Sequence, residues 1–216
     1  LDPLLRQALA EDLGRGDITT NAILGQTGSS TADEIRFQAT LIAKENLVLA
    51  GWPIFIRVFQ LLGEVEAELL CEEGAPICSG DTVGRLEGKA SLLLKGERVA
   101  LNFMQRMCGV ATLTRSYVER VSHTQAKVLD TRKTTPLWRA LEKYAVRMGG
   151  GNNHRFGLDD GILIKENHIA VAGGVREAIE ACQSSMNHLQ RVEVEVRNHQ
   201  EIRQALSAGA DIILLD

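Results

Sequence analysis

Several features that mark known classes of protein are missing from this sequence of 216 residues. Its four cysteines have neither metal-ligand spacing nor a secretory context, so we expect reduced thiols in a cytosolic protein. Positive charge is not in excess, because the formal net charge is −4 at pH 7. We therefore expect no sequence-independent binding of nucleic acid, although a local basic pocket remains compatible with this balance.

Long apolar runs are also missing. The best candidate, residues 47–62, is too short for a membrane span and contains Pro53, Arg57 and Gln60, which favours a buried strand and helix. No signal peptide and no Ser-His-Asp or Cys-His nucleophile set is apparent. The expectation is a cytoplasmic protein with no membrane segment.

The N-terminal half has the pattern of an α/β layer. Apolar residues with helical spacing predict a first helix near residues 4–12 and another over 52–62, and alternation predicts strands over 35–43 and 47–50. Glycine-punctuated short strands over 64–95 favour an antiparallel sheet, since the tip sequence of a lipoyl-like carrier hairpin is lacking. A long helix follows over about 96–122, with Gly109 a possible point of interruption.

The second half alternates strands with helices. Strands are predicted at 127–129, 162–164, 192–196 and 212–215, and helices at 136–148, 175–184 and 200–207. Nearly continuous apolar strands in this order indicate a parallel sheet covered by helices. Four strands are fewer than the roughly eight of a closed barrel. Since the chain ends on Asp216 at a strand tip, we expect the natural protein to continue.

Positive side chains follow the predicted strands or lie in the loop between them. Arg132 and Lys133 come after strand 127–129, Lys165 comes after strand 162–164, and His154 with Arg155 follows the glycine run between them. The carboxyl ends of parallel strands converge on one face, where ligands bind. Arginine and lysine at such a face suit carboxylates and phosphates. The pattern predicts a site for strongly anionic ligands.

Two carboxylates, Glu195 and Asp216, belong to neighbouring strand ends, where they could hold a magnesium diphosphate or stabilise a developing cation. Arg98 falls in the first turn of the predicted helix 96–122, where the helix dipole disfavours a cation, so either Glu97 or an anionic ligand must compensate it. These residues indicate an enzyme for two anionic substrates without naming them.

Seven sequence blocks resemble the quinolinate phosphoribosyltransferase family, also called carboxylating nicotinate-nucleotide pyrophosphorylases. The blocks are ERVALN at 97–102, DTRKT at 130–134, KYAV at 143–146, GGG with NHR at 149–155, LIKENH at 163–168, VEVE at 192–195 and LLD at 214–216. The resemblance implies an α/β fold in which an N-terminal α/β sandwich domain, residues 1–110, precedes an incomplete parallel α/β barrel, residues 111–216, truncated at its C-terminus.

The resemblance also implies an activity. The family transfers the phosphoribosyl group of phosphoribosyl pyrophosphate to quinolinate with decarboxylation, giving nicotinate mononucleotide, diphosphate and CO2 for NAD biosynthesis. By the matching positions, Arg98, Arg132, Arg155 and Lys165 bind the quinolinate carboxylates, with His154 beside them, and the catalytic residues Lys133, Glu195 and Asp216 face phosphoribosyl pyrophosphate and its Mg2+. A homodimer or higher homo-oligomer is implied, with Arg98 reaching the neighbouring site.

Two departures from the family pattern stand out. Leu137 replaces a glycine that the family commonly has after Thr135-Pro136, and the glycine-rich C-terminal loops that cradle the ribose phosphate are not in this sequence. Two alternatives stay open. One is a phosphoribosyltransferase that acts on nicotinate or another ring acid without decarboxylation. The other is a non-catalytic anion-binding module, which Glu195 and Asp216 disfavour because they repel anions unless a metal intervenes.

Overall fold

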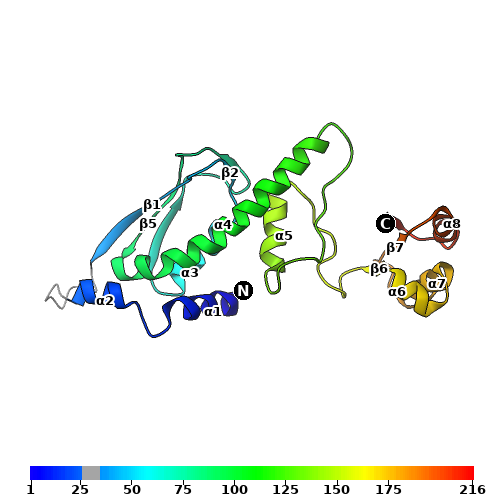
Figure 1. Ribbon diagram of the computed structural model, residues 1–216, viewed down its shortest axis with the longest axis horizontal. Coiled ribbons are helices and arrows are strands. Elements are labelled where there is room, and N and C mark those ends of the chain that lie inside the picture. Colours follow the sequence, from blue (N-terminus) through cyan, green and yellow to red (C-terminus); the bar gives the residue numbers. More distant parts are fainter. Residues whose placement is uncertain (26–34) are drawn as a thin grey trace. The chain divides into compact units, whose positions relative to one another are not determined.

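The computed structural model describes residues 1–25 and 35–216, which form two compact units, Leu1–His154 and Arg155–Asp216 (Figure 1). The elements of the first unit are α1 (Asp2–Leu13), α2 (Ile18–Gly25), β1 (Arg36–Ile42), β2 (Leu47–Val48), α3 (Trp52–Gln60), β3 (Val65–Leu69), β4 (Pro76–Ile77), β5 (Thr82–Lys89), α4 (Ala90–Val121) and α5 (Arg139–Met148). Those of the second are β6 (Ile162–Ile164), α6 (Glu166–Ala172), α7 (Val175–Ser185), β7 (Val192–Val196), α8 (His199–Ser207) and β8 (Ile212–Leu215). None of the described helices is long and apolar enough to cross a membrane.

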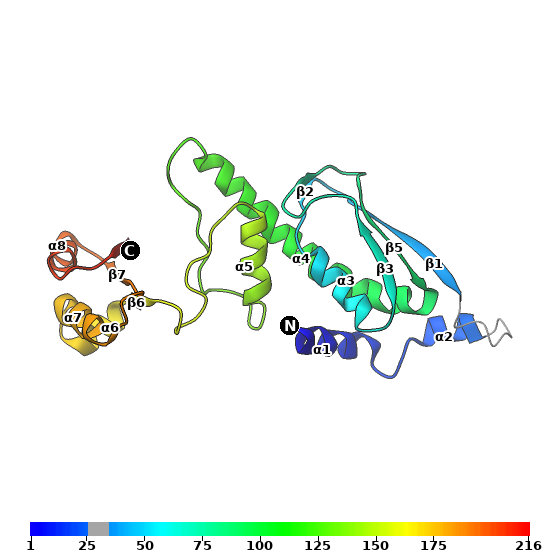
Figure 2. The same cartoon turned by 180° about the vertical axis from the view of Figure 1, so that it is seen from behind.

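The long helix α4 organises the first unit. Its apolar residues recur every three or four positions, so that Val99, Phe103 and Met107 are buried against the rest of the core. The antiparallel sheet β1-β5-β3 and helix α3 pack along α4, and α5 packs on it further toward its C-terminus (Figures 1 and 2). The predicted layer of helices against an antiparallel sheet is confirmed.

The bounds of α4 correct one inference about Arg98. The helix begins at Ala90, which places Arg98 in its third turn, so the prediction that Arg98 stands in the first turn against the helix dipole is wrong. The helix also continues through Gly109. A glycine in a helix interior costs about 1 kcal/mol relative to alanine. Burial of Met104, Met107 and Ala111 on either side of Gly109 offsets that cost.

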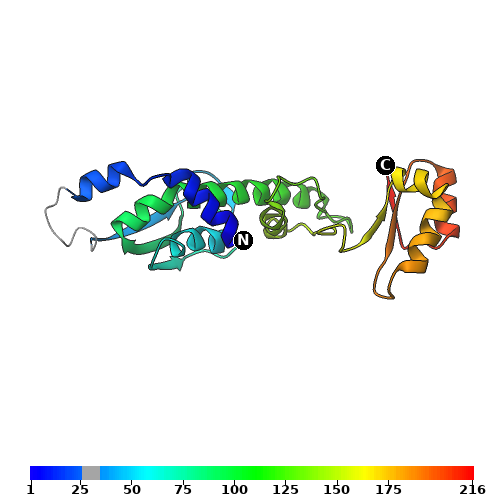
Figure 3. The ribbon, with the colours of Figure 1, turned by 90° about the horizontal axis from the view of Figure 1, so that it is seen from below.

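The second unit contains a parallel sheet in the order β6-β7-β8. Alternate residues of β7, Val192, Val194 and Val196, are fully buried. The helices of this unit lie on one face of the sheet (Figure 3). The predicted parallel sheet covered by helices is confirmed, and the chain is an α/β protein with an N-terminal sheet layer and a C-terminal parallel α/β part.

The strand predicted at residues 127–129 is not a member of that sheet. This segment makes a single parallel bridge, between Leu129 and Asn152, inside the first unit. Leu129 is 52% exposed, so its apolar character does not reflect the two-sided burial of a central parallel strand. Two short helices, α2 and α6, were not predicted, because neither is long enough to show a clear periodicity.

Helix α5 begins three residues later than predicted, after an unusual backbone conformation at Leu137. Leu137 has φ +66°, the one positive φ of a non-glycine residue in the part of the chain that the structure describes. The next residue, Trp138, stacks on Phe103 of α4 with ring centroids 4.7 Å apart. This stack fixes the start of α5, so Leu137 must take the left-handed conformation that glycine takes without steric cost.

We predict that Leu137→Gly stabilises the protein. The left-handed conformation costs a non-glycine residue about 1–2 kcal/mol, which glycine would relieve. The greater flexibility of glycine in the unfolded chain offsets about 0.5–1 kcal/mol of this stabilisation. Leu137 is 80% exposed, so little packing is lost. The free energy of unfolding, measured by urea titration, should rise by up to about 1 kcal/mol. Leu158→Gly, at an exposed turn residue with ordinary φ, should give no gain, and a lower midpoint for Leu137→Gly would contradict the prediction.

Candidate functional site

The segment that carries Arg132 and Lys133 is attached to the segment that carries His154 by backbone hydrogen bonds. The Asn152 N–H donates to the Val128 carbonyl at 2.8 Å, and the Asp130 N–H donates to the Asn152 carbonyl at 3.1 Å. These bonds form the parallel bridge at Leu129. They bring Asp130 next to Asn153 and His154, although more than twenty residues separate them in the sequence.

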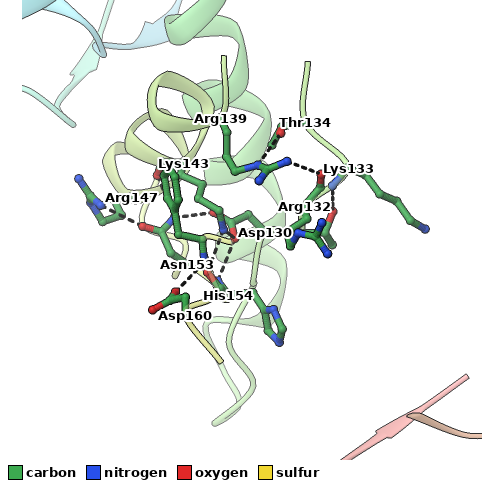
Figure 4. Close-up of polar contacts among 12 residues, drawn as sticks. Asp130, Arg132, Lys133, Thr134, Arg139, Lys143, Arg147, Asn153, His154 and Asp160 are labelled. Carbon is green, nitrogen blue, oxygen red and sulfur yellow. Dashed lines mark hydrogen bonds and ion pairs between the residues drawn. The ribbon is translucent and has the colours of Figure 1, made fainter. Parts of the chain in front are cut away.

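The carboxylate of Asp130 accepts three hydrogen bonds, one from α5 and two from the segment that contains Asn153 and His154 (Figure 4). Its Oδ1 accepts from Lys143 Nζ at 2.5 Å and from the His154 N–H at 2.8 Å, and its Oδ2 accepts from Asn153 Nδ2 at 2.5 Å. Lys143 Nζ also donates to the His154 carbonyl at 2.8 Å. The side chains of Lys143 and Asp130 are only 3% and 7% exposed, so the pair is buried and its charges are satisfied from within.

Helix α5 also holds the loop that follows Asp130. Arg139, at the start of the helix, donates from Nε to Thr134 Oγ1 at 3.1 Å and from Nη2 to the Arg132 carbonyl at 3.5 Å. Inside the loop, the Lys133 N–H donates to Thr131 Oγ1 at 3.0 Å. Arg139 and Lys143 lie one helical turn apart and therefore contact the same loop from one face of α5. The loop backbone is fixed while the side chain of Lys133 extends away from the Asp130 cluster (Figure 4).

Three cationic side chains of the first unit form no ion pair. Within residues 1–25 and 35–216, no carboxylate pairs with Arg98, Arg132 or Lys133. Arg98 and Lys133 are exposed, and the Nε of Arg132 is buried with no hydrogen-bond partner among the residues that the structure describes. A buried donor with no acceptor costs free energy. An anionic ligand beside Arg132 would supply the missing acceptor.

In the second unit the structure brings Lys165 and Glu195 together. Lys165 directly follows β6, and its Nζ donates to Glu195 Oε2 on β7. Glu195 pairs with Leu214 of β8 in the sheet register, so Asp216, two residues further on, belongs to the same face. The buried valines of β7 occupy the opposite face. Lys165, Glu195 and Asp216 therefore share one face at one end of three neighbouring strands, although Glu195 is the fourth residue of β7 and does not end it.

Arg155 begins the second unit, and its Nη1 donates to the Gly161 carbonyl at 2.8 Å. His154, the neighbouring residue, closes the first unit and is held through its backbone N–H and carbonyl by Asp130 and Lys143. No three His, Cys, Asp or Glu side chains gather into a metal site anywhere in the described ranges. The residues predicted to act together thus fall into two groups, one in each unit.

Sequence reasoning missed the roles of Asp130, Lys143 and Asn153. The signal was present in part, since basic residues recur every four positions along α5 at Arg139, Lys143 and Arg147. Such a stripe is normally a solvated face. Its middle member is instead buried, because Asp130 supplies a partner that only the folded chain brings near.

Comparison with known proteins assigns the chain to a family. Residues 17–108 match the family model of the quinolinate phosphoribosyl transferase N-terminal domain. Residues 110–216 match the family model of the quinolinate phosphoribosyl transferase C-terminal domain. The chain is 43% identical, over its whole length, to 72% of a protein of Bacillus subtilis named "Probable nicotinate-nucleotide pyrophosphorylase (carboxylating)". A protein of the same name from Synechocystis is 42% identical, over 71% of its length.

Solved structures agree. The crystal structure of NadC from Streptococcus pyogenes has a TM-score of 0.91 and 44% identity, with all of this chain and 74% of that one covered. The nicotinate-nucleotide pyrophosphorylase of Francisella tularensis has a TM-score of 0.89 and 40% identity, with 99% and 73% covered. Together with the fixed cationic loop and the carboxylates of the parallel sheet, these matches show that the chain belongs to the quinolinate phosphoribosyltransferase family.

Proposed function

We propose that this protein is a carboxylating nicotinate-nucleotide pyrophosphorylase. It transfers the phosphoribosyl group of phosphoribosyl pyrophosphate to quinolinate, with decarboxylation, and thereby makes nicotinate mononucleotide, diphosphate and CO2 for NAD biosynthesis. The observation that carries the proposal is the buried Nε of Arg132, for which the described part of the chain supplies no acceptor, on a loop whose backbone is held by α5. A rigid guanidinium with donors to spare suits the carboxylate of a small dianion.

The residues of the site divide between the two substrates. Arg98, Arg132, Arg155 and Lys165, with His154 beside them, act on the two carboxylates of quinolinate. Lys133, Glu195 and Asp216 act on phosphoribosyl pyrophosphate. Support comes from Arg98, Arg132 and Lys133, which pair with no carboxylate of the described residues, and from the shared sheet face of Lys165, Glu195 and Asp216.

A divalent metal, proposed to be Mg2+, accompanies phosphoribosyl pyrophosphate. Glu195 and Asp216 offer oxygen donors on one sheet face, which is the ligand type that Mg2+ prefers, and they would hold the ion directly or through water. When bound, the ion would neutralise charge on the diphosphate. The positive charge of Lys165 partly neutralises the Glu195 carboxylate, so Glu195 and Asp216 together repel an anion less than two unpaired carboxylates would.

The reaction forms two bonds to carbon and breaks two. The ring nitrogen of quinolinate attacks the anomeric carbon of the ribose while the bond from that carbon to the diphosphate oxygen breaks. The quaternised ring then loses the adjacent carboxylate as CO2, and the ring carbon takes up a proton from solvent. The cationic side chains hold two anions in contact and stabilise charge on the departing diphosphate, so that preorganised electrostatics and orientation carry the catalysis.

Three further properties belong to the proposal. The protein is a homodimer or a larger assembly of dimers, in which Arg98 of one subunit serves the neighbouring site; the exposed position of Arg98 on α4 supports this. A cytoplasmic location fits the four free cysteines. The boundary between sandwich and barrel domains lies near residues 110 and 111, close to the point where the two family descriptions meet.

The activity itself is the first prediction to test. The full-length gene product, supplied with phosphoribosyl pyrophosphate and Mg2+, should turn over quinolinate with one CO2 released per mononucleotide formed. Nicotinate, offered in parallel, should be a poor substrate because it lacks the second carboxylate. Mononucleotide is measured by liquid chromatography and CO2 by release of label. Turnover of nicotinate alone would favour the non-decarboxylating alternative, and binding of anions without turnover and without dependence on Mg2+ would favour the binding module.

We predict that Arg132→Ala lowers kcat/KM for quinolinate by at least about thirtyfold, equivalent to about 2 kcal/mol of transition-state stabilisation. The loss follows from removing a charged donor whose Nε has no acceptor within residues 1–25 and 35–216. Arg120→Ala, at an exposed residue near the end of α4, is the matched control and should leave kcat/KM unchanged. An unchanged value in Arg132→Ala would remove this residue from the site.

Sharing of Arg98 between subunits predicts complementation. Arg98→Ala and Lys165→Ala proteins should each be inactive, and mixed dimers made by refolding the two together should regain about half of the activity of the wild type. This is the share expected when each mixed dimer has one intact site of two. Mixed dimers are isolated through tags that differ between the two subunits, and their activity is then measured with quinolinate as the substrate. Mixed dimers that stay inactive would place Arg98 in the site of its own subunit.

A further inference from the structure

We propose that Lys143 is a positioning residue of this enzyme, which acts through the Asp130 carboxylate to hold Arg132, Lys133 and His154 in place. Only the kinetic consequence of the proposal rests on the proposed function. Its structural content, that Lys143 fixes the backbone of these segments, concerns contacts inside the first unit alone.

The contacts around His154 are the first argument. The His154 N–H donates to Asp130 Oδ1 at 2.8 Å, and the His154 carbonyl accepts from Lys143 Nζ at 2.8 Å. Lys143 Nζ and Asp130 Oδ1 are themselves 2.5 Å apart. The main chain at His154 is therefore held on both sides by the two partners of one ion pair. Neither partner can move without releasing the backbone of a predicted substrate-binding residue.

The loop after Asp130 gives the second argument. Asp130 is two residues before Arg132, and its carboxylate is held by Lys143. The Arg132 carbonyl is held by Arg139, one turn before Lys143 on α5. Both attachments come from the same face of the helix, so the position of α5 sets the position of the loop (Figure 4). Because the backbone of Arg132 is held in place, its guanidinium keeps a defined position in which it can meet a ligand.

Burial separates this pair from a surface salt bridge. The lysine is 3% exposed and the aspartate 7%, and a buried ion pair stabilises a fold little compared with apolar residues of the same shape. Such a pair fixes the relative positions of the segments that it joins, because each charged group forms hydrogen bonds in defined directions. Asp130 has three donors, Lys143 from α5 and the adjacent residues Asn153 and His154, so its carboxylate joins α5 to the segment of His154.

The test compares Lys143→Met with Tyr144→Phe. Methionine keeps the length of the lysine side chain and removes its charge and its donors. Tyr144 is the next residue of α5, and its hydroxyl donates to Glu73 Oε2 at 2.9 Å, away from the Asp130 cluster. Its change removes one of several contacts that hold the helix, while the Arg115 bond to the Gly149 carbonyl, the Trp138–Phe103 stack and the Asp130 cluster stay in place. We expect Lys143→Met to raise KM for quinolinate by at least about tenfold. Tyr144→Phe should lower the unfolding midpoint with KM unchanged.

A double variant separates positioning from stability. Lys143→Met leaves the Asp130 carboxylate buried without its counter-charge, and adding Asp130→Asn removes that charge. The double variant should therefore unfold at a higher midpoint than Lys143→Met, while the His154 carbonyl still lacks its donor and KM for quinolinate stays high. Recovery of KM together with stability would overturn the proposal, because the lysine would then serve the fold alone.

Hydrogen exchange supplies a readout that does not depend on activity. In Lys143→Met and in the double variant, peptides covering residues 128–135 and 152–155 should exchange at least about tenfold faster than in the wild type, while peptides of β1, β3 and β5 keep their rates. Unchanged exchange in these peptides would overturn the proposal. If the wild type fails to turn over quinolinate, the proposed function fails, and the exchange rates still decide whether Lys143 holds these segments.

Discussion

The buried contact between Lys143 and Asp130 is the constraint on which the arrangement of cations in the first unit depends, and it requires α5 to be held in place from its other side. The Tyr144 hydroxyl donates to the Glu73 carboxylate at 2.9 Å. Burial is the main cause that raises the pKa of this phenol, and the Glu73 carboxylate is the second, so the hydroxyl keeps the proton that it donates. Arg115 of α4 donates to the Gly149 carbonyl at 3.0 Å, at the end of α5. The N-terminal layer thus acts as the support of α5, and α5 as the support of the loop after Asp130.

Charge is distributed unevenly over side chains of the same type. Lys143 is paired with a carboxylate and hidden from solvent, whereas Lys133, ten residues earlier, is exposed and pairs with no carboxylate that the structure describes. The difference lies in which residue Asp130 meets in the folded chain. A buried lysine with no partner would lose its proton or destabilise the fold, so its charge can be used only to hold a neighbour. An unpaired cation keeps its charge available for an anionic ligand.

Sequence patterns predicted the helices and strands that repeat their apolar periodicity over many residues. They also predicted which side chains meet when that meeting follows from the order of strands in the sheet. The apolar stripe of α4 and the alternation of strands with helices after residue 160 are of this kind, as is the convergence of Lys165 and Glu195. The patterns failed where tertiary contacts decide. Leu129 makes one bridge in place of a ladder, and Lys143 is buried because Asp130 and the His154 carbonyl, distant in sequence, surround its amine. No local signal encodes such a meeting.

Two lysine–carboxylate pairs, Lys143 with Asp130 and Lys165 with Glu195, differ in whether a ligand can reach the lysine. In the pair of Lys165 with Glu195 the lysine is 49% exposed, and exchanging one carboxylate partner for another at such a site changes the free energy little. A substrate carboxylate can therefore compete with Glu195 for Lys165. No ligand can compete for Lys143, since its amine is enclosed by Asp130 and a main-chain carbonyl. Exposure, more than charge or residue type, thus decides which lysine can meet substrate and which can only set the position of residues that do.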